Sequence, residues 1–99
     1  MVPLKLQFVQ RAATQLNEIL SFIALDNPEA AGKISEQVID LLEKVREYPN
    51  MGKVVFRKMP YREVQAYPCR IIYRRLEKVI LVVAVIRGEQ LLRRSMLTN

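Results

Sequence analysis

The 99-residue sequence has no histidine, no tryptophan and one cysteine, Cys69. A zinc cluster therefore lacks its usual ligands, and a lone cysteine cannot form an internal disulfide. We expect no metal or cofactor, and we predict that Cys69 is a small buried hydrophobic residue, with a reactive thiol as the alternative. The longest uncharged apolar run, Val79–Ile86, has eight residues, against about 20 for a membrane span. The N-terminus lacks a signal-peptide pattern, so we expect a cytoplasmic protein with no membrane partner.

Glycine is scarce and apolar residues make up 51% of the chain, which is typical of a packed globular domain. At this length we predict a single domain over residues 1–99. Its charge is unevenly divided. Residues 10–48 carry four Lys/Arg against seven Asp/Glu, whereas residues 49–99 carry eleven Lys/Arg against three Asp/Glu, a net charge of +8. We therefore expect the second half to face a polyanion or an acidic partner.

The spacing of apolar residues predicts a strand, two helices and then further strands. Leu4, Leu6 and Phe8 alternate with polar residues, which indicates a half-buried strand. Two stretches with helical periodicity follow, and the segment YPNMG ends the second. The predicted helices are Gln10–Leu25 and Pro28–Glu47, and the later strands are 54–58 or 61–66, Cys69–Arg75 and Lys78–Arg87.

The short connection between the helices predicts an antiparallel helical hairpin. Asn27 is a good N-cap for the second helix, and Pro28 suits its first position. A continuous apolar seam is predicted on this helix at Ile34, Val38, Leu41, Val45 and Tyr48. The residues expected to be buried are Leu16, Ile19, Ile23, Ile34, Val38, Leu41, Leu81 and Val83.

The run Val79–Ile86 is apolar at every position, which predicts an interior strand with both faces covered. A tight turn near Leu76-Glu77 requires antiparallel pairing with the preceding strand. Strict side-chain alternation places Arg87 on the same face as Val79, Leu81, Val83 and Val85. Segment 89–99 is predicted as either a short helix or a last strand. The expected fold class is α+β, an N-terminal strand and a two-helix hairpin packed on a mostly antiparallel three- to four-stranded sheet.

Several motifs accompany these elements. They are AATQLNEILSFIALDNPEAAGKI in the hairpin, YPNMG after it, YREV at the first sheet strand, and YPCRIIYR leading into VILVVAVIRG. The order of the elements and these motifs, over about residues 4–90, resembles the RelE/ParE toxins of bacterial toxin–antitoxin modules, and the details are most similar to the ParE branch. The resemblance implies neutralisation by a cognate antitoxin, docked along the hairpin or beside the sheet edge. The basic second half implies that this antitoxin is acidic.

The resemblance implies one of two activities, poisoning of DNA gyrase (ParE-like) or ribosome-dependent cleavage of mRNA (RelE-like). Metal-independent RNA cleavage needs a general base, a general acid and cations around the phosphate. Histidine, the residue best suited to proton transfer, is absent. Glu63, Tyr61 or Tyr73 could replace it only with a pKa moved toward neutrality, and simpler interpretations exist: a salt-bridge partner for Glu63 and amphipathic strand residues for the tyrosines. The sequence therefore favours binding over catalysis.

The arginines are interpreted as a recognition surface. The candidate target-binding residues are Arg57, Lys58, Arg62, Arg70 and Arg87, and the alternative nuclease would use Arg62, Glu63 and Arg87. The resemblance implies a role for Arg62 in the YRE motif, although an ion pair with Glu43 or Glu47 is an equal alternative. The remaining arginines of the second half are expected to be solvated or to face the antitoxin; they are Arg74, Arg75, Arg93 and Arg94.

The leading hypothesis is a non-enzymatic inhibitor of DNA gyrase, neutralised by its cognate antitoxin. The first alternative is a ribosome-dependent mRNA endonuclease, with the ribosome and mRNA as partners. The second is a non-toxic family member that only binds its antitoxin.

Overall fold

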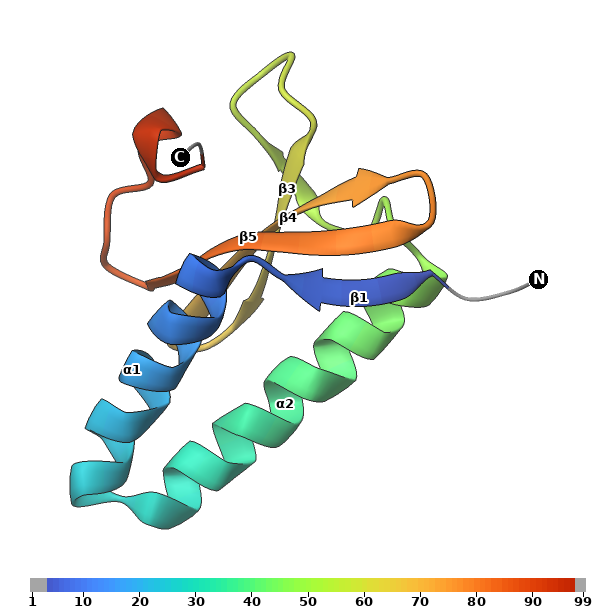
Figure 1. Cartoon of the computed structure of the whole chain (residues 1–99). Coiled ribbons are helices and arrows are strands. Elements are labelled where there is room, and N and C mark those ends of the chain that lie inside the picture. Colours follow the sequence, from blue (N-terminus) through green and yellow to red (C-terminus); the bar gives the residue numbers. More distant parts are fainter. Residues whose placement is uncertain (1–3, 98–99) are drawn as a thin grey trace.

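The computed structural model describes residues 4–97. Both helices and the three long strands predicted from the sequence are present, with bounds that agree within one residue (Figure 1). The elements are β1 (Lys5–Phe8), α1 (Gln10–Asp26), α2 (Pro28–Glu47), β2 (Lys53–Val55), β3 (Tyr61–Ala66), β4 (Cys69–Leu76), β5 (Val79–Arg87) and the short 3-10 helix η1 (Arg94–Met96).

A single residue, Asn27, links α1 to α2. Its backbone N–H donates to the Ile23 carbonyl at 2.9 Å, and its side-chain oxygen accepts from the Ala30 N–H at 3.1 Å. Pro28 occupies the first turn of α2, where a missing N–H costs nothing. With one residue ending one helix and capping the next, the chain reverses sharply, and the predicted antiparallel hairpin is confirmed.

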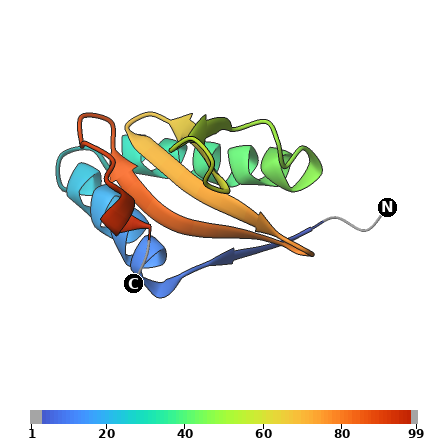
Figure 2. The ribbon, with the colours of Figure 1, turned by 90° about the horizontal axis from the view of Figure 1, so that it is seen from above.

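The five strands form one mixed sheet in the order β1-β5-β4-β3-β2. β5 therefore lies inside the sheet, as predicted, between β1 and β4. The sheet is larger than the expected three or four strands for two reasons. The N-terminal strand joins it, parallel to β5. Of the two candidate segments before Cys69, 61–66 forms β3 as predicted, and 54–58 is replaced by the shorter β2, which ends at Val55. A parallel pair needs a long connection between its strands, and here the helical hairpin together with β2, β3 and β4 forms it (Figure 2).

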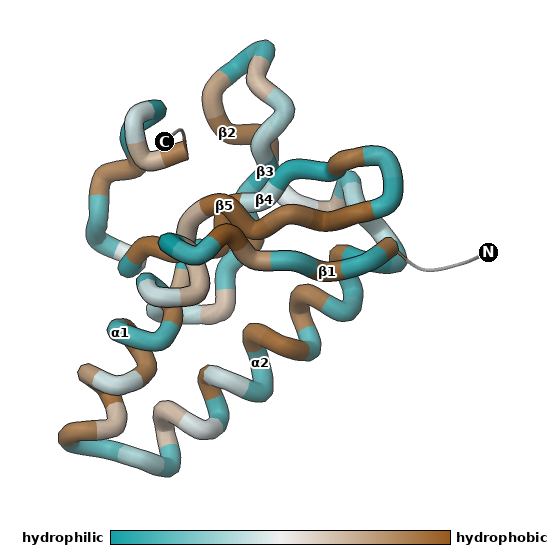
Figure 3. The backbone as a smooth tube through the Cα atoms, in the orientation of Figure 1, coloured by the Kyte–Doolittle hydropathy of each residue, from teal (hydrophilic) through white to brown (hydrophobic). Residues whose placement is uncertain are grey.

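The main core lies between the hairpin and one face of the sheet. Ile19, Val38 and Val83 are buried as predicted, but the seam on α2 runs through Val38, Leu42 and Val45. The alternation of apolar and polar residues along both helices is visible in Figure 3. Tyr48, predicted to extend the seam, is 65% exposed. Five other residues were predicted to be buried but are only partly buried: Leu16, Ile23, Ile34, Leu41 and Leu81.

Two apolar stripes overlap on α2, which explains the error. Leu41 and Leu42 each lie three or four residues from Val38 and Val45, so either fits helical periodicity. Leu42 belongs to the main core at 1% exposure, whereas Leu41 is only partly buried against the same core. Because α2 packs against both α1 and the sheet, its apolar stripe is wider than a single line of residues.

A β-bulge in β5 changes the side-chain alternation of that strand. Ile72 pairs with Ala84 and Tyr73 with Val82, which leaves Val83 as an extra residue. Beyond the bulge, Val85 packs in the core beneath the helices. Arg87 therefore shares a face with Val85 but not with Val79, Leu81 or Val83, and the predicted alternation was wrong at this point.

The C-terminal segment forms neither the predicted strand nor a full helix. It crosses the face of the sheet opposite the helices, which we call the second face, and ends in η1 beside the start of α1 (Figure 2). Leu92 and Leu97 pack on this face, and an Arg11 guanidinium N–H donates to the Met96 carbonyl. Residues 98 and 99 of the predicted segment lie outside the described residues. No helix within residues 4–97 is long and apolar enough to cross a membrane.

Candidate functional site

The second face of the sheet gathers cations around an apolar floor. Tyr61, Ile72, Val83 and Ala84 form the floor, and Leu97 of the C-terminal segment packs on it. From the opposite side, the loop between β2 and β3 contributes Phe56 and Met59 to the same cluster. Arg70 and Arg74 of β4 lie on this side beside Glu63 and Tyr61, and Arg94 lies over Phe56. The exposed Arg57 and Lys58 belong to the loop that Phe56 and Met59 attach to the floor. We call these five residues the cationic face.

A buried ion pair organises one end of the cationic face. Two N–H groups of Arg70 donate to the two carboxylate oxygens of Glu63, each at 2.9 Å. Gln65 donates to the same carboxylate at 2.7 Å, and the third donor of Arg70 reaches the Gln90 carbonyl at 2.7 Å. Because Glu63 is only 7% exposed, this bidentate geometry is needed to hold its charge away from water.

The environment of Glu63 keeps its carboxylate ionised. Burial acts to raise the pKa of Glu63, but hydrogen bonds from Arg70 and Gln65, with the charges of Arg70 and Lys53, outweigh it, so the pKa is lowered. A general base for RNA cleavage would need a pKa closer to neutrality and a free lone pair facing the substrate. Glu63 has the opposite properties, as the salt-bridge interpretation of the sequence anticipated.

Two other arginines of the cationic face lie over aromatic rings. The Arg74 guanidinium is 5.9 Å from the centre of the Tyr61 ring, and the Arg94 guanidinium is 5.7 Å from that of Phe56. The Nε of Arg74 is buried, and within residues 4–97 it has no hydrogen-bond partner. A buried donor without a partner costs free energy. The Arg74 side chain as a whole is only partly buried, so the exposed part of its guanidinium can donate to another molecule.

Arg57 and Lys58 lie at the tip of the loop between β2 and β3, and both are exposed. The loop takes an unusual backbone path, since Phe56 has φ of 57° and Lys58 φ of 71°. Side-chain-bearing residues rarely adopt these angles unless their surroundings enforce them. Phe56 and Met59 supply the anchor by packing on the second face, so the two loop cations are held in place.

Arg62 and Arg87, predicted to join the same surface, lie elsewhere. Arg62 points from β3 toward the end of α2, where its Nη1 donates to the carbonyls of Asn50 (3.1 Å) and Gly52 (2.8 Å). Its partners within the chain are backbone oxygens, in place of the Glu43 or Glu47 carboxylates considered as alternatives. Arg62 and Gly52 lie beside Tyr73. The buried hydroxyl of Tyr73 donates to the Pro49 carbonyl at 2.7 Å.

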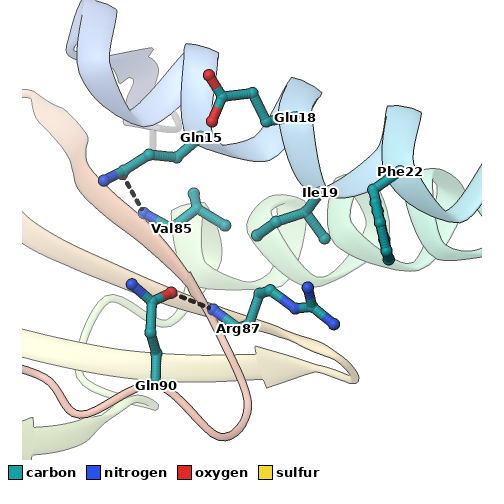
Figure 4. Close-up of a pocket in the computed structure, with 7 residues that line it drawn as sticks. All are labelled: Gln15, Glu18, Ile19, Phe22, Val85, Arg87 and Gln90. Carbon is teal, nitrogen blue, oxygen red and sulfur yellow. Dashed lines mark hydrogen bonds between the residues drawn. The ribbon is translucent and has the colours of Figure 1, made fainter.

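Arg87 lies at the end of β5, in a pocket of about 360 Å³ between α1 and that strand end (Figure 4). Its guanidinium is 5.3 Å from the Phe22 ring centre and 3.2 Å from the Glu89 carboxylate. The structure thus brings Arg57, Lys58 and Arg70 to one surface and separates them from Arg62 and Arg87.

Sequence reasoning missed Arg74 and Arg94 as members of the main cationic surface. The alternation of β4 could have revealed Arg74, because Arg70, Ile72 and Arg74 point to the same side of the sheet. Arg94 follows an irregular segment, for which no periodicity exists.

The described residues show no metal site. Between Leu4 and Leu97 no group of three His, Cys, Asp or Glu side chains is placed to hold a metal ion. Cys69 is fully buried, as predicted, and burial raises the pKa of its thiol. A buried thiol with a raised pKa is a poor nucleophile, which supports the interpretation of Cys69 as a core residue.

Comparison with known proteins places the chain in a family. The profile of the family described as "ParE toxin of type II toxin-antitoxin system, parDE" matches residues 6–92. Comparison with curated proteins gave no match. Among solved structures, 13 chains match, including one from the "Chromosomal ParDE TA system from P. aeruginosa". That chain is 21% identical with a TM-score of 0.70, and the alignment covers 87% of this chain and 97% of that one.

Two further solved structures carry RelE names. One is the toxin–antitoxin complex RelBE2 from Mycobacterium tuberculosis, with 20% identity, a TM-score of 0.60 and coverage of 88% and 93%. The other is a double-arginine mutant of E. coli toxin RelE in the free state, with 22% identity, a TM-score of 0.61 and coverage of 89% and 86%. At these identities the likeness establishes the fold. Because the family profile spans residues 6–92, the chain belongs to the ParE toxin family of type II toxin–antitoxin systems.

Proposed function

We propose that this toxin acts in the bacterial cytoplasm by binding DNA gyrase and arresting growth, and that a cognate acidic antitoxin neutralises it. The observation that carries the choice of binding over cleavage is the state of Glu63. Across β3, β4 and β5, all described, it is the only carboxylate, and Arg70 and Gln65 engage it fully. The cationic face therefore offers charge and aromatic surface but lacks an available carboxylate base.

The cationic face is suited to a negatively charged protein or nucleic acid surface. Arg74 and Arg94 are the strongest candidates for target contacts, since each keeps donor capacity while an aromatic ring fixes its position. Arg57 and Lys58 extend the same surface from the loop. Arg70 and Arg62 already donate within the chain, so we propose that they position their surroundings and add less to target affinity.

The test compares two targets with the same purified protein. We expect inhibition of gyrase supercoiling, or trapped cleaved DNA, and intact mRNA in a reconstituted translation reaction. Arg74→Ala and Arg94→Ala should each weaken gyrase inhibition by about 10- to 150-fold, because a lost charge-assisted hydrogen bond costs about 1.5–3 kcal/mol. Arg75→Ala is the matched control, since Arg75 neighbours Arg74 on β4 and is exposed outside the cationic face.

The alternatives give different results in the same experiment. Cuts in ribosome-bound mRNA that disappear in Glu63→Gln, in a variant shown by circular dichroism to be folded, would establish the endonuclease and overturn our proposal. A chain that binds its antitoxin but leaves both gyrase and mRNA untouched would be the non-toxic family member.

A further inference from the structure

The two sides of the molecule carry opposite charge. The helical hairpin covers one face of the sheet, and residues 10–48, which include it, carry four Lys/Arg against seven Asp/Glu (Figure 1). On the second face, β2, β3, β4, β5 and the loop 56–60, all described, have one carboxylate, Glu63, and Arg70 neutralises it. A polyanion is therefore attracted to the second face and repelled by the hairpin side.

A sixth cation, Lys53, lies beside the cationic face. It is exposed on β2 and pairs with Glu63 of β3. Directly opposed residues of an antiparallel pair share a face of the sheet, and the charge of Lys53 also contributes to the lowered pKa of Glu63. Because Arg70 already binds that carboxylate, Lys53 adds to the positive charge of the surface.

Most of these cations keep donors for another molecule. Within residues 4–97, no hydrogen bond or ion pair engages the side chains of Lys53, Arg57, Lys58, Arg74 and Arg94. Along β4, Arg70 and Arg74 are four residues apart, about 13 Å at the usual rise of a strand. A DNA duplex carries about eight phosphate charges over that length. Several of the cations can therefore each meet a phosphate of one duplex.

The surface beneath the cations is closed, which distinguishes it from a protein interface. The floor residues Tyr61, Ile72, Val83 and Ala84 are at most 7% exposed. Protein–protein interfaces usually have an apolar centre with few charges, whereas protein–DNA interfaces are polar and strongly positive. The cationic face has the second pattern.

The aromatic rings of this surface are covered by arginines. The Tyr61 ring, in a residue only 7% exposed, lies under Arg74, and the partly buried Phe56 lies under Arg94. Proteins that bind single strands without sequence preference usually stack the bases on accessible aromatic rings. Because these rings are covered, the surface offers contacts to phosphates rather than to bases. This favours a duplex, in which the bases are already stacked on one another.

We propose that the cationic face, together with Lys53, binds the phosphate backbone of duplex DNA directly and without reading its sequence. The inference deepens the proposed function and rests on it, because the substrate of gyrase is duplex DNA. In the complex, the cationic face would contact the DNA that gyrase holds, and another surface of the toxin would contact the gyrase protein.

The first experiment measures binding of the purified full chain to a short labelled DNA duplex by fluorescence anisotropy, without gyrase. If about four phosphates are contacted, binding should weaken roughly 100-fold between about 50 and 200 mM salt. Arg57→Ala should lower the affinity about five- to tenfold at about 100 mM salt and reduce the salt slope by about one, since one phosphate contact is lost. Arg75→Ala is the matched control, exposed outside the cationic face, and should keep the slope and stay within about twofold in affinity.

Several results would overturn the DNA contact. Equal losses in Arg57→Ala and Arg75→Ala, both shown to be folded by thermal melting, would mean that only the net charge matters. An affinity that does not change with salt would exclude phosphate contacts. Tighter binding to single-stranded DNA, or to RNA of the same sequence, would assign the surface to that nucleic acid.

The gyrase assay separates this inference from the proposed function. A toxin that inhibits gyrase without binding DNA would overturn the DNA contact and leave the gyrase target standing, with an acidic protein surface opposite the cationic face. A toxin that binds DNA with the expected salt slope but leaves gyrase active would support the DNA contact and refute the gyrase target.

Discussion

The Glu63–Arg70 pair provides the sharpest test of how the cationic face is held together, because its two ends are unequally buried. The Glu63 side chain is 5% exposed and the Arg70 side chain 21%. Arg70→Met leaves a buried carboxylate with one remaining donor, Gln65. Glu63→Gln leaves a guanidinium that can still reach water and the Gln90 carbonyl. Arg70→Met should therefore be the more damaging substitution.

The expected costs follow from burial. Removing one partner of a buried ion pair destabilises by about 3–5 kcal/mol, and we expect this cost for Arg70→Met. For Glu63→Gln we expect about 1–3 kcal/mol, the cost of an imperfectly paired polar group. In a domain of this size each 1 kcal/mol lowers the melting temperature by about 4–8 °C. The double variant should be more stable than Arg70→Met alone, since no charge is left buried.

The same pair predicts a pH dependence. The pKa of Glu63 is lowered in the folded state, so its stabilisation is fully present above the unfolded-state pKa of about 4.3 and is lost as the pH falls through the lower folded-state pKa. In Arg70→Met the isolated carboxylate should instead have a raised pKa. The stability gap between wild type and Arg70→Met should therefore narrow as the pH is lowered from 7 toward 4.

Urea unfolding followed by circular dichroism at several pH values measures each of these quantities. The double-variant cycle gives the coupling energy between the two residues. Equal destabilisation by the two single variants, or a gap that does not change with pH, would contradict the geometry described here.

Three further predictions concern the core. Gly52→Ala should destabilise strongly, since a Cβ there would lie 2.6 Å from the Tyr73 hydroxyl oxygen and 2.9 Å from a Tyr73 ring carbon. Gly52→Ala combined with Tyr73→Phe should recover part of the loss, and no recovery would exclude the hydroxyl as the cause. Leu42→Ala should cost about 2–5 kcal/mol and Leu41→Ala clearly less, measured by thermal melting; the reverse order would place the seam through Leu41. The Cys69 thiol should react with a thiol reagent only as fast as the chain unfolds, and rapid labelling of the folded protein would show that it is accessible.

The sequence was sufficient for the elements whose patterns are local. Helical periodicity with Asn27 and Pro28 at the break gave the hairpin, and the uninterrupted apolar run gave the interior position of β5. The parallel addition of β1 was not predictable in the same way, because it depends on the whole hairpin returning the chain to the other edge of the sheet. The exposure of Tyr48 likewise depends on where α2 leaves the sheet.

The candidate site was predicted less well, for a physical reason. Charge composition indicates how many cations exist, whereas the direction of each strand residue decides which of them meet. Arg62 and Glu63 are neighbours in sequence and point to opposite faces of β3. The pairing of Glu63 with Arg70 requires the register of β3 against β4, and Arg94 reaches the face through an irregular segment.

The bulge at Val83 has a consequence for comparing this toxin with its relatives. A relative with the same number of residues but no bulge would alternate strictly along β5, so that its last arginine would point to the second face, the side of Arg70 and Arg74, in place of the side of Phe22. Two homologues could thus share an arginine in the same alignment column and present it to different molecules. When functional residues at this strand end are compared between relatives, the face of the sheet to which each residue points should be established before the alignment column is used.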